Sequence, residues 1–207
     1  MKPAILAAAL TLAALLAACG DDADSPGGTT APAETSASAP TDVTSENFKT
    51  PVTVAINDEW SAEVDAENEY ILHRPTSPSG PGGVIAFLYV QTVYNPENTL
   101  QTEDAPADMA EWLRTHALLD VRSEEPVNIA GYTGTRLETV ADNVDDFPVF
   151  ELSDGPYDLL FNEHSYFYVL DVGDEQLVIQ VTPENPPQFP VFSDAAVPVL
   201  GSAEIEG

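Results

Sequence analysis

The chain has 207 residues, of which 35 are Asp or Glu and only 6 are Lys or Arg, so its formal net charge at pH 7 is −29. A surface with this charge repels phosphate groups, and the composition therefore excludes nucleic acid as a partner and direct side-chain contact with anionic lipid head groups. The acidic residues are spread along residues 21–206 and are not gathered in one block. This distribution favours a solvated surface suited to a saline or alkaline habitat over the alternative, recruitment of cations or of a basic partner.

The first 18 residues have the pattern of an export signal. Lys2 forms a short basic region, and residues 4–18 are apolar apart from Thr11. This run suits the hydrophobic region of a signal peptide and is shorter than the roughly 20 apolar residues that a membrane-spanning helix needs. The sequence therefore predicts that residues 1–18 direct export and are removed.

The signal ends at Leu16-Ala17-Ala18-Cys19, which contains the only cysteine of the chain. This tetrapeptide resembles the lipobox of bacterial lipoprotein precursors. The resemblance implies that Cys19 is diacylglycerated, that cleavage occurs just before it, and that the lipid holds the protein on the outer face of the cell membrane. Several acyl chains on one residue give a stable anchor, whereas one chain is marginal. The alternative is an ordinary secretory signal with an incidental cysteine.

The composition changes sharply after the signal. Residues 20–47 are rich in Ala, Pro, Ser, Thr, Gly and acid, with Val43 as the only large aliphatic residue. Such a segment buries too little apolar surface to offset its ordering entropy, so we predict that residues 19–47 form a lipidated, disordered acidic tether. The remaining residues, 48–207, are long enough for a single domain with one core.

Most of this domain has the patterning of β-strands. The first half predicts strands over residues 50–56, 60–65, 69–74 and 84–94. A turn is expected at Asn57-Asp58, and a loop rich in Pro and Gly at residues 75–83. The segment 84–94 is apolar on both faces, which is typical of a central strand.

One convincing helix is predicted, over residues 103–119. Glu103 or Asp104 is expected to cap it, and Pro106 suits its first turn. A stripe at helical spacing, which we expect to face the core, consists of Met109, Trp112 and Leu113.

Two hairpins and a final short element complete the domain. Residues 126–140 are expected to turn near Gly131, and residues 165–182 to turn at Gly173-Asp174. In the second hairpin, the alternation places Tyr166, Tyr168 and Leu170 on one face of its first strand and Leu177, Ile179 and Val181 on one face of its second. Residues 193–206 predict a short helix or turn and a last strand. The predicted fold class is α+β, one antiparallel sheet with one main packed helix.

A second resemblance covers residues 84–205 and is clearest in "MAEWLRTHALLDVRSEEPVNIAGYTGTRLE", residues 109–138. The segment resembles one that recurs in uncharacterised actinobacterial secreted proteins and lipoproteins. There, a Trp-Leu-Arg helix ends in a His-containing turn that precedes a strand and a Gly-x-x-Gly hairpin. The resemblance implies a Mog1/PsbP-like sandwich. It implies no activity, because the shared motifs are packing motifs.

The histidines offer little chemistry. No two of the three histidines, His73, His116 and His164, have the i, i+4 spacing of a helical metal site. No Gly-x-Ser-x-Gly elbow precedes a helix. His116 is expected to be half-buried packing or a helix C-terminal cap. His164 could ligate a metal with a carboxylate from residues 142–146, but a surface turn histidine is the favoured interpretation.

The remaining candidate sites are equally weak. The turn Asp142–Asp146 offers oxygen ligands for weak calcium binding but lacks the glycine and terminal glutamate of the calcium-binding loop, so a plain acidic turn is favoured. The loop 74–83 has no lysine and no following helix, which excludes a phosphate cradle. We expect Trp60, Trp112 and residues 166–168 to be core rather than a ligand box.

The sequence thus assigns one site, lipidation at Cys19, and no catalytic residue, cofactor or metal. It favours an anchored, non-catalytic binding module that contacts the membrane through its lipid and an envelope protein or cell-wall material through its domain. The alternative is a surface-anchored hydrolase whose nucleophile the spacing does not identify.

Overall fold

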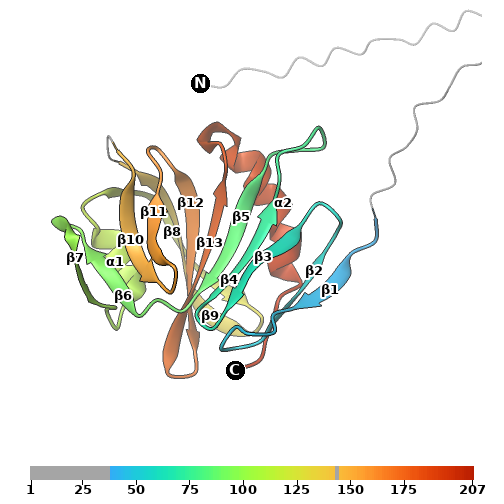
Figure 1. Ribbon diagram of the computed structural model, residues 1–207, viewed down its shortest axis with the longest axis horizontal. Helices are drawn as coiled ribbons and strands as arrows, with labels where there is room; N and C mark the ends of the chain where they lie inside the picture. The colour runs from blue at the N-terminus through green and yellow to red at the C-terminus, as the bar shows by residue number, and fades with distance from the viewer. Residues whose placement is uncertain (1–37, 143–144) are drawn as a thin grey trace, which may run out of the picture. The chain divides into compact units, whose positions relative to one another are not determined.

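The computed structural model describes residues 38–142 and 145–207. Over these residues the chain forms three antiparallel sheets and two α-helices (Figure 1). The predicted signal, Cys19 and most of the predicted tether lie outside the described residues.

The largest sheet has seven strands in the order β3-β4-β5-β13-β12-β9-β8. Their bounds are β3 (Ser61–Ala66), β4 (Glu69–Arg74), β5 (Gly83–Leu88), β8 (Leu119–Ile129), β9 (Tyr132–Ala141), β12 (His164–Val172) and β13 (Glu175–Pro183).

Two smaller sheets accompany it. The four-stranded sheet, in the order β11-β10-β6-β7, contains β6 (Thr92–Asn95), β7 (Asn98–Asp104), β10 (Phe147–Leu152) and β11 (Gly155–Leu159). The three-stranded sheet, in the order β1-β2-β14, contains β1 (Thr41–Thr44), β2 (Val52–Ile56) and β14 (Glu204–Ile205).

The helices are α1 (Met109–Thr115) and α2 (Phe189–Gly201), and a 3₁₀ turn at Pro186–Gln188 leads into α2. Within the described residues, neither helix has the length and apolar character that a membrane crossing requires.

The seven-stranded sheet carries a hydrophobic core on each face, because side chains alternate along a strand. On one face, Leu170 packs with Phe192 of α2 and Val54 of the three-stranded sheet. On the other face, Phe167 packs with Leu113 of α1 and with the four-stranded sheet. Figure 1 shows α1 beside the four-stranded sheet and α2 on the other side of the large sheet. Burial on both faces makes this sheet the centre of the fold.

Both predicted hairpins are confirmed. Strands β8 and β9 meet at Ala130-Gly131, and β12 pairs with β13 around Gly173, whose φ of 63° suits a residue without a Cβ. The predicted alternation also holds, since Leu170 and Leu177 pack in the same core.

The strand predicted over residues 84–94 is split. Strand β5 lies between β4 and β13 near the middle of the large sheet, as a central strand should, while β6 belongs to the four-stranded sheet. Strand β5 is apolar on both faces because both faces of the large sheet are covered: Ile85 and Phe87 belong to one core, and Ala86 and Leu88 to the other.

The helix predicted over residues 103–119 is shorter than expected. Asp108 is its N-cap and accepts a hydrogen bond from the amide of Glu111 at 2.9 Å, while Glu103 and Asp104 belong to β7. Pro106 therefore precedes the helix. Met109 and Leu113 are buried, as predicted.

The predicted α+β class fits these antiparallel sheets and two helices, but the finer prediction of one sheet with one main packed helix does not hold. There are three sheets, and the longer helix is α2, which was expected only as a short helix or turn. Pro198 obscures α2 in the sequence, because proline in a helix interior is unfavourable. The tether boundary also shifts, because Val43 in β1 pairs with Val54 in β2 inside the segment predicted to be disordered.

Candidate functional site

The one site that the sequence assigns, Cys19, lies outside the described residues. The described part of the chain therefore bears only on the weaker candidates and on polar clusters that the sequence did not reveal.

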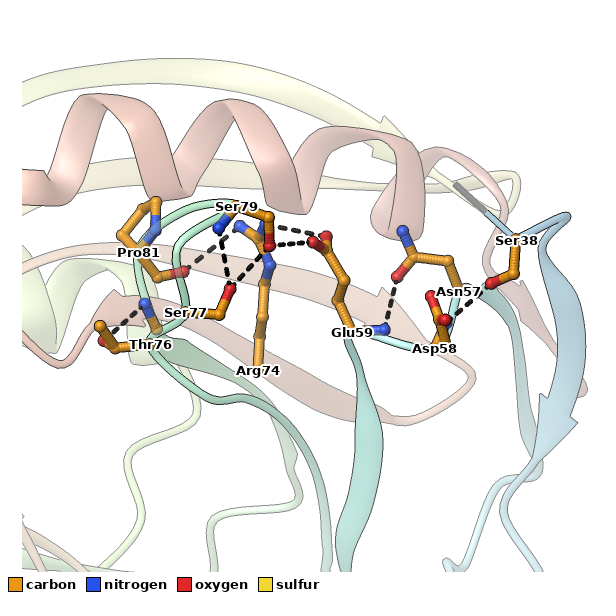
Figure 2. A network of polar contacts seen from close by, with 10 residues as sticks. Ser38, Asn57, Asp58, Glu59, Arg74, Thr76, Ser77, Ser79 and Pro81 are labelled. Atoms are coloured by element: carbon orange, nitrogen blue, oxygen red, sulfur yellow. Dashed lines mark hydrogen bonds and ion pairs between the residues drawn. The ribbon is translucent and has the colours of Figure 1, made fainter. Parts of the chain in front are cut away.

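The loop 74–83 closes over its own arginine (Figure 2). The guanidinium of Arg74 is buried and donates to Oε2 of Glu59 at 2.8 Å and to the carbonyl of Pro81 at 3.3 Å. A hydrogen bond from Ser79 and the charge of Arg74 lower the pKa of Glu59. A Cβ on Gly80 would lie 2.9 Å from the guanidinium, so the loop fits tightly around it. The polar groups of the loop thus pair with one another around Arg74.

The same loop contacts Glu184, which follows β13. His73 Nε2 lies 3.0 Å from Glu184 Oε1, and the hydroxyl of Thr76 donates to Oε2 at 2.7 Å. These bonds lower the pKa of the Glu184 carboxyl. The carboxylate separates the imidazole from the hydroxyl, so the histidine does not face a nucleophile.

His116 caps the C-terminal end of α1, which confirms one of the two expected alternatives, and it is buried rather than half-buried. Its Nδ1 accepts from the amide of Leu118 at 3.2 Å, and its ring packs between Trp112 and Phe147. Burial lowers the pKa of His116 to about 4. The ring is therefore neutral near pH 7 and serves packing.

His164 is the first residue of β12, and its ring stacks on Phe189 of α2 with centroids 3.6 Å apart. Its Nε2 lies 2.9 Å from Oε1 of Glu138 on β9. The partner carboxylate thus comes from the neighbouring strand rather than from residues 142–146. His164 is therefore half-buried and packed against α2, whereas the sequence favoured a histidine in a surface turn.

The turn Asp142–Asp146 lies partly outside the described residues, which omit residues 143–144. Asp146 Oδ1 accepts from the amide of Phe161 at 2.8 Å. Across the residues that the structure describes, no three His, Cys, Asp or Glu side chains gather around a space for a metal ion.

The aromatic candidates are mostly core residues. Trp60 is buried against Phe192, with ring centroids 5.7 Å apart. Phe167 and Tyr168 are buried on opposite faces of the large sheet, and Trp112 is half-buried. No open aromatic platform results from these residues.

A cluster that the sequence did not reveal surrounds Glu163, just before β12. Its Oε1 accepts from the hydroxyl of Ser165 at 2.9 Å and from the side-chain amide of Gln180 at 2.8 Å. Its Oε2 accepts from the backbone amide of Leu160 at 3.0 Å. Tyr157 of β11 donates to Gln180, which links the four-stranded sheet to the large one. We call Glu163, Ser165, Gln180 and Tyr157 the Glu163 cluster.

Burial dominates the electrostatics of this cluster. It raises the pKa of Glu163, and the donors from Leu160, Ser165 and Gln180 lower that pKa part of the way. Burial also raises the pKa of Tyr157. The sequence did not indicate this cluster. The alternation in the hairpin places Gln180 on the face opposite Leu177, and that face is expected to be solvent-exposed unless a second sheet covers it.

The turn between β11 and β12 presents Leu160 and Phe161 to solvent, each 51% exposed. Asn162 has a φ of 57°, and the amide of Glu163 donates to the carbonyl of Leu160 at 2.9 Å, which closes the turn. A half-exposed apolar pair is therefore held in a defined geometry.

Compared with known proteins, the chain matches no protein-family model and no curated protein.

Proposed function

We propose that this protein is an extracytoplasmic lipoprotein, anchored to the cell membrane through Cys19, and that its domain is a non-catalytic binding module of the cell envelope. The observation that carries the proposal is the sequence Leu16-Ala17-Ala18-Cys19 at the end of an export signal, with the only cysteine at the position where a lipobox requires it. Acyl chains on this residue would give a stable peripheral anchor.

The polar geometry supports binding over hydrolysis. Nucleophilic catalysis needs a base within hydrogen-bonding distance of a hydroxyl or thiol. Among the described residues, His73 and His164 face carboxylates, and His116 packs between aromatic rings. The Glu163 carboxyl is enclosed by donors that hold it in place.

A Mog1/PsbP-like sandwich is the finer fold assignment that we propose. It is supported by an antiparallel sheet with α1 packed on one face and α2 on the other.

The anchor is tested by expressing wild type, Cys19→Ser and the control Ala18→Gly, which keeps a small residue before the cysteine. Cell fractions are separated, and the mass of the protein is measured in each. We expect wild type and the control to be cleaved and membrane-bound, and Cys19→Ser to be uncleaved or soluble. Cleaved Cys19→Ser protein that stays with the membrane would contradict the proposal.

The non-catalytic role is tested with a panel of ester, peptide and glycoside substrates, for which we expect no turnover. Turnover that disappears on replacing one Ser, Asp or Glu would establish the hydrolase instead.

A further inference from the structure

Three features that each oppose the stability of the fold occur together in the turn 160–163. The first is apolar exposure. Among the described residues, the large hydrophobic side chains that are more than half exposed are Leu160 and Phe161 in this turn and Val191 and Val197 on α2. Leu160 and Phe161 are adjacent in the chain, and one of them is aromatic. Single exposed apolar residues are common, but a neighbouring pair on a fixed turn forms a small apolar knob.

The second feature is a fixed and strained backbone. Asn162 has a φ of 57°, a conformation that asparagine tolerates better than most residues but at a cost. Carboxylates hold both exposed residues through their amides, since Leu160 donates to Glu163 and Phe161 donates to Asp146. The apolar pair is thus presented rigidly, which lowers the entropy lost when it binds.

The third feature is a buried acid at the base of the turn. Glu163 is 6% exposed, and one of its oxygens accepts the amide of Leu160. Burial disfavours the charged form of this carboxyl group. Local features that oppose stability and coincide at one place are expected at functional sites.

The charge around the turn restricts what it can bind. Residues 137–207 contain no Lys or Arg. Asp146 contacts the turn, and its neighbour Asp145 is exposed, as is Asp158 at the end of β11. These carboxylates repel an anionic lipid surface and a second copy of the same turn, and they attract a cationic surface.

We propose that the turn 160–163 is the element that docks a basic protein partner, whose apolar side chains, flanked by Lys or Arg, pack against Leu160 and Phe161. This proposal rests on the proposed function as a binding module and specifies the chemistry of its partner.

The test uses the mature chain, Cys19–Gly207, on phosphatidylcholine vesicles. The probe is a synthetic peptide with a Trp-Leu pair between pairs of lysines, and its matched control has Ser-Ser in place of Trp-Leu. Affinities are compared for wild type, the double variant Leu160→Ser/Phe161→Ser and the control double variant Val191→Ser/Val197→Ser. Melting curves verify that both variants are folded.

We expect the turn variant to bind the Trp-Leu peptide at least about tenfold more weakly than wild type, because two apolar side chains lose their buried contacts. The α2 variant should bind within about twofold of wild type, and the Ser-Ser peptide should bind weakly to all three proteins. Equal affinities, or equal losses in the two variants, would overturn the proposal.

Two further outcomes would also overturn it. Quenching of a Phe161→Trp side chain by brominated lipid would assign the turn to the membrane, and loss of self-association in the turn variant would assign it to a second copy. Failure of the anchor is visible separately, because the protein would then not be retained on the vesicles, and the same peptide titration would be done in solution.

Discussion

At the scale of single residues, Glu163 links the protonation state of the protein to its stability. The carboxyl group receives donors from Ser165, Gln180 and Leu160, yet burial still raises its pKa. A carboxyl whose pKa is higher in the folded state makes a contribution to stability that is fully present below the unfolded pKa of about 4.3. That contribution is lost as the pH rises through the folded pKa.

We therefore predict that Glu163→Gln flattens the pH dependence of stability. Between pH about 4.3 and neutrality, wild type should lose about 1.4 kcal/mol for each unit by which the pKa is raised, and the variant should not. Melting curves recorded across this range measure the difference in slope. The exposed Glu206→Gln serves as control and should follow wild type; a Glu163→Gln profile parallel to wild type would refute the linkage.

His116 acts in the opposite direction. Burial lowers its pKa to about 4, below the value of about 6.5 for an unperturbed imidazole. Its contribution to stability is thus present above pH about 6.5 and is lost as the pH falls toward the folded pKa, with a total of about 3 kcal/mol. Its Nδ1 accepts from Leu118, so the neutral ring carries its proton on Nε2.

The corresponding prediction is spectroscopic. The ring signals of His116 in nuclear magnetic resonance spectra should not shift between pH about 8 and about 5. A titration midpoint near the unperturbed value would mean that the ring is solvated and that the packing between Trp112 and Phe147 is wrong.

At the scale of elements, α2 covers one face of the large sheet through Phe192. This side chain is fully buried, packs on Trp60, and lies so close to Gly83 that a Cβ there would fall 2.6 Å from the ring. The same Cβ would fall still closer to the backbone carbonyl oxygen of Thr182, so the neighbouring strand and α2 together require glycine at the start of β5.

Phe192→Ala should therefore destabilise the domain by about 3–5 kcal/mol, because it leaves a cavity in a close-packed core. The neighbouring Val191→Ala, at an exposed position, should change the free energy of unfolding by less than about 0.5 kcal/mol. Urea denaturation measures both. Similar values for the two variants would show that α2 is not docked as described.

The elements that the sequence predicts correctly are those with strong local patterns. The hairpin around Gly173 has strict alternation and a glycine turn, and both hold in the structure. Strands β10 and β11 were not predicted, because Pro148 and Pro156 interrupt their patterns and mark the runs as loops.

The features that the sequence did not predict depend on contacts between elements distant in the chain. The apolar run 84–94 satisfies the pattern of one central strand, and only the presence of a second sheet shows that it serves two. The sequence likewise predicts that Gln180 is solvent-exposed, because it does not show that the four-stranded sheet buries this residue together with Glu163. Among the candidate residues, burial of His116 was predictable from its place after the helical stripe, whereas the contact of His164 with Glu138 required strand register.

At the scale of the whole molecule, the net charge of −29 should make stability depend on salt. Like charges repel more strongly in the compact state than in the unfolded chain. The screening length is about 30 Å at 0.01 M salt and about 3 Å at 1 M. Dozens of weak repulsions then act against a net stability of only about 5–15 kcal/mol.

We predict that the melting temperature is several degrees higher in about 1 M than in about 10 mM sodium chloride, with most of the rise complete by a few tenths molar. A continued linear rise would indicate exclusion of salt from the surface instead. A melting temperature that does not respond to salt would mean that the acidic groups do not repel one another appreciably, which would leave the saline-habitat interpretation without a physical basis.

The central claim, that Cys19 anchors this acidic domain to the membrane, is tested most directly by the mass of the N-terminal peptide of the mature protein from its native cells. We predict that this peptide begins at Cys19 and carries the mass of a diacylglyceryl group on its sulfur. A mature N-terminus at any other residue, or an unmodified Cys19 thiol in the membrane fraction, would contradict it.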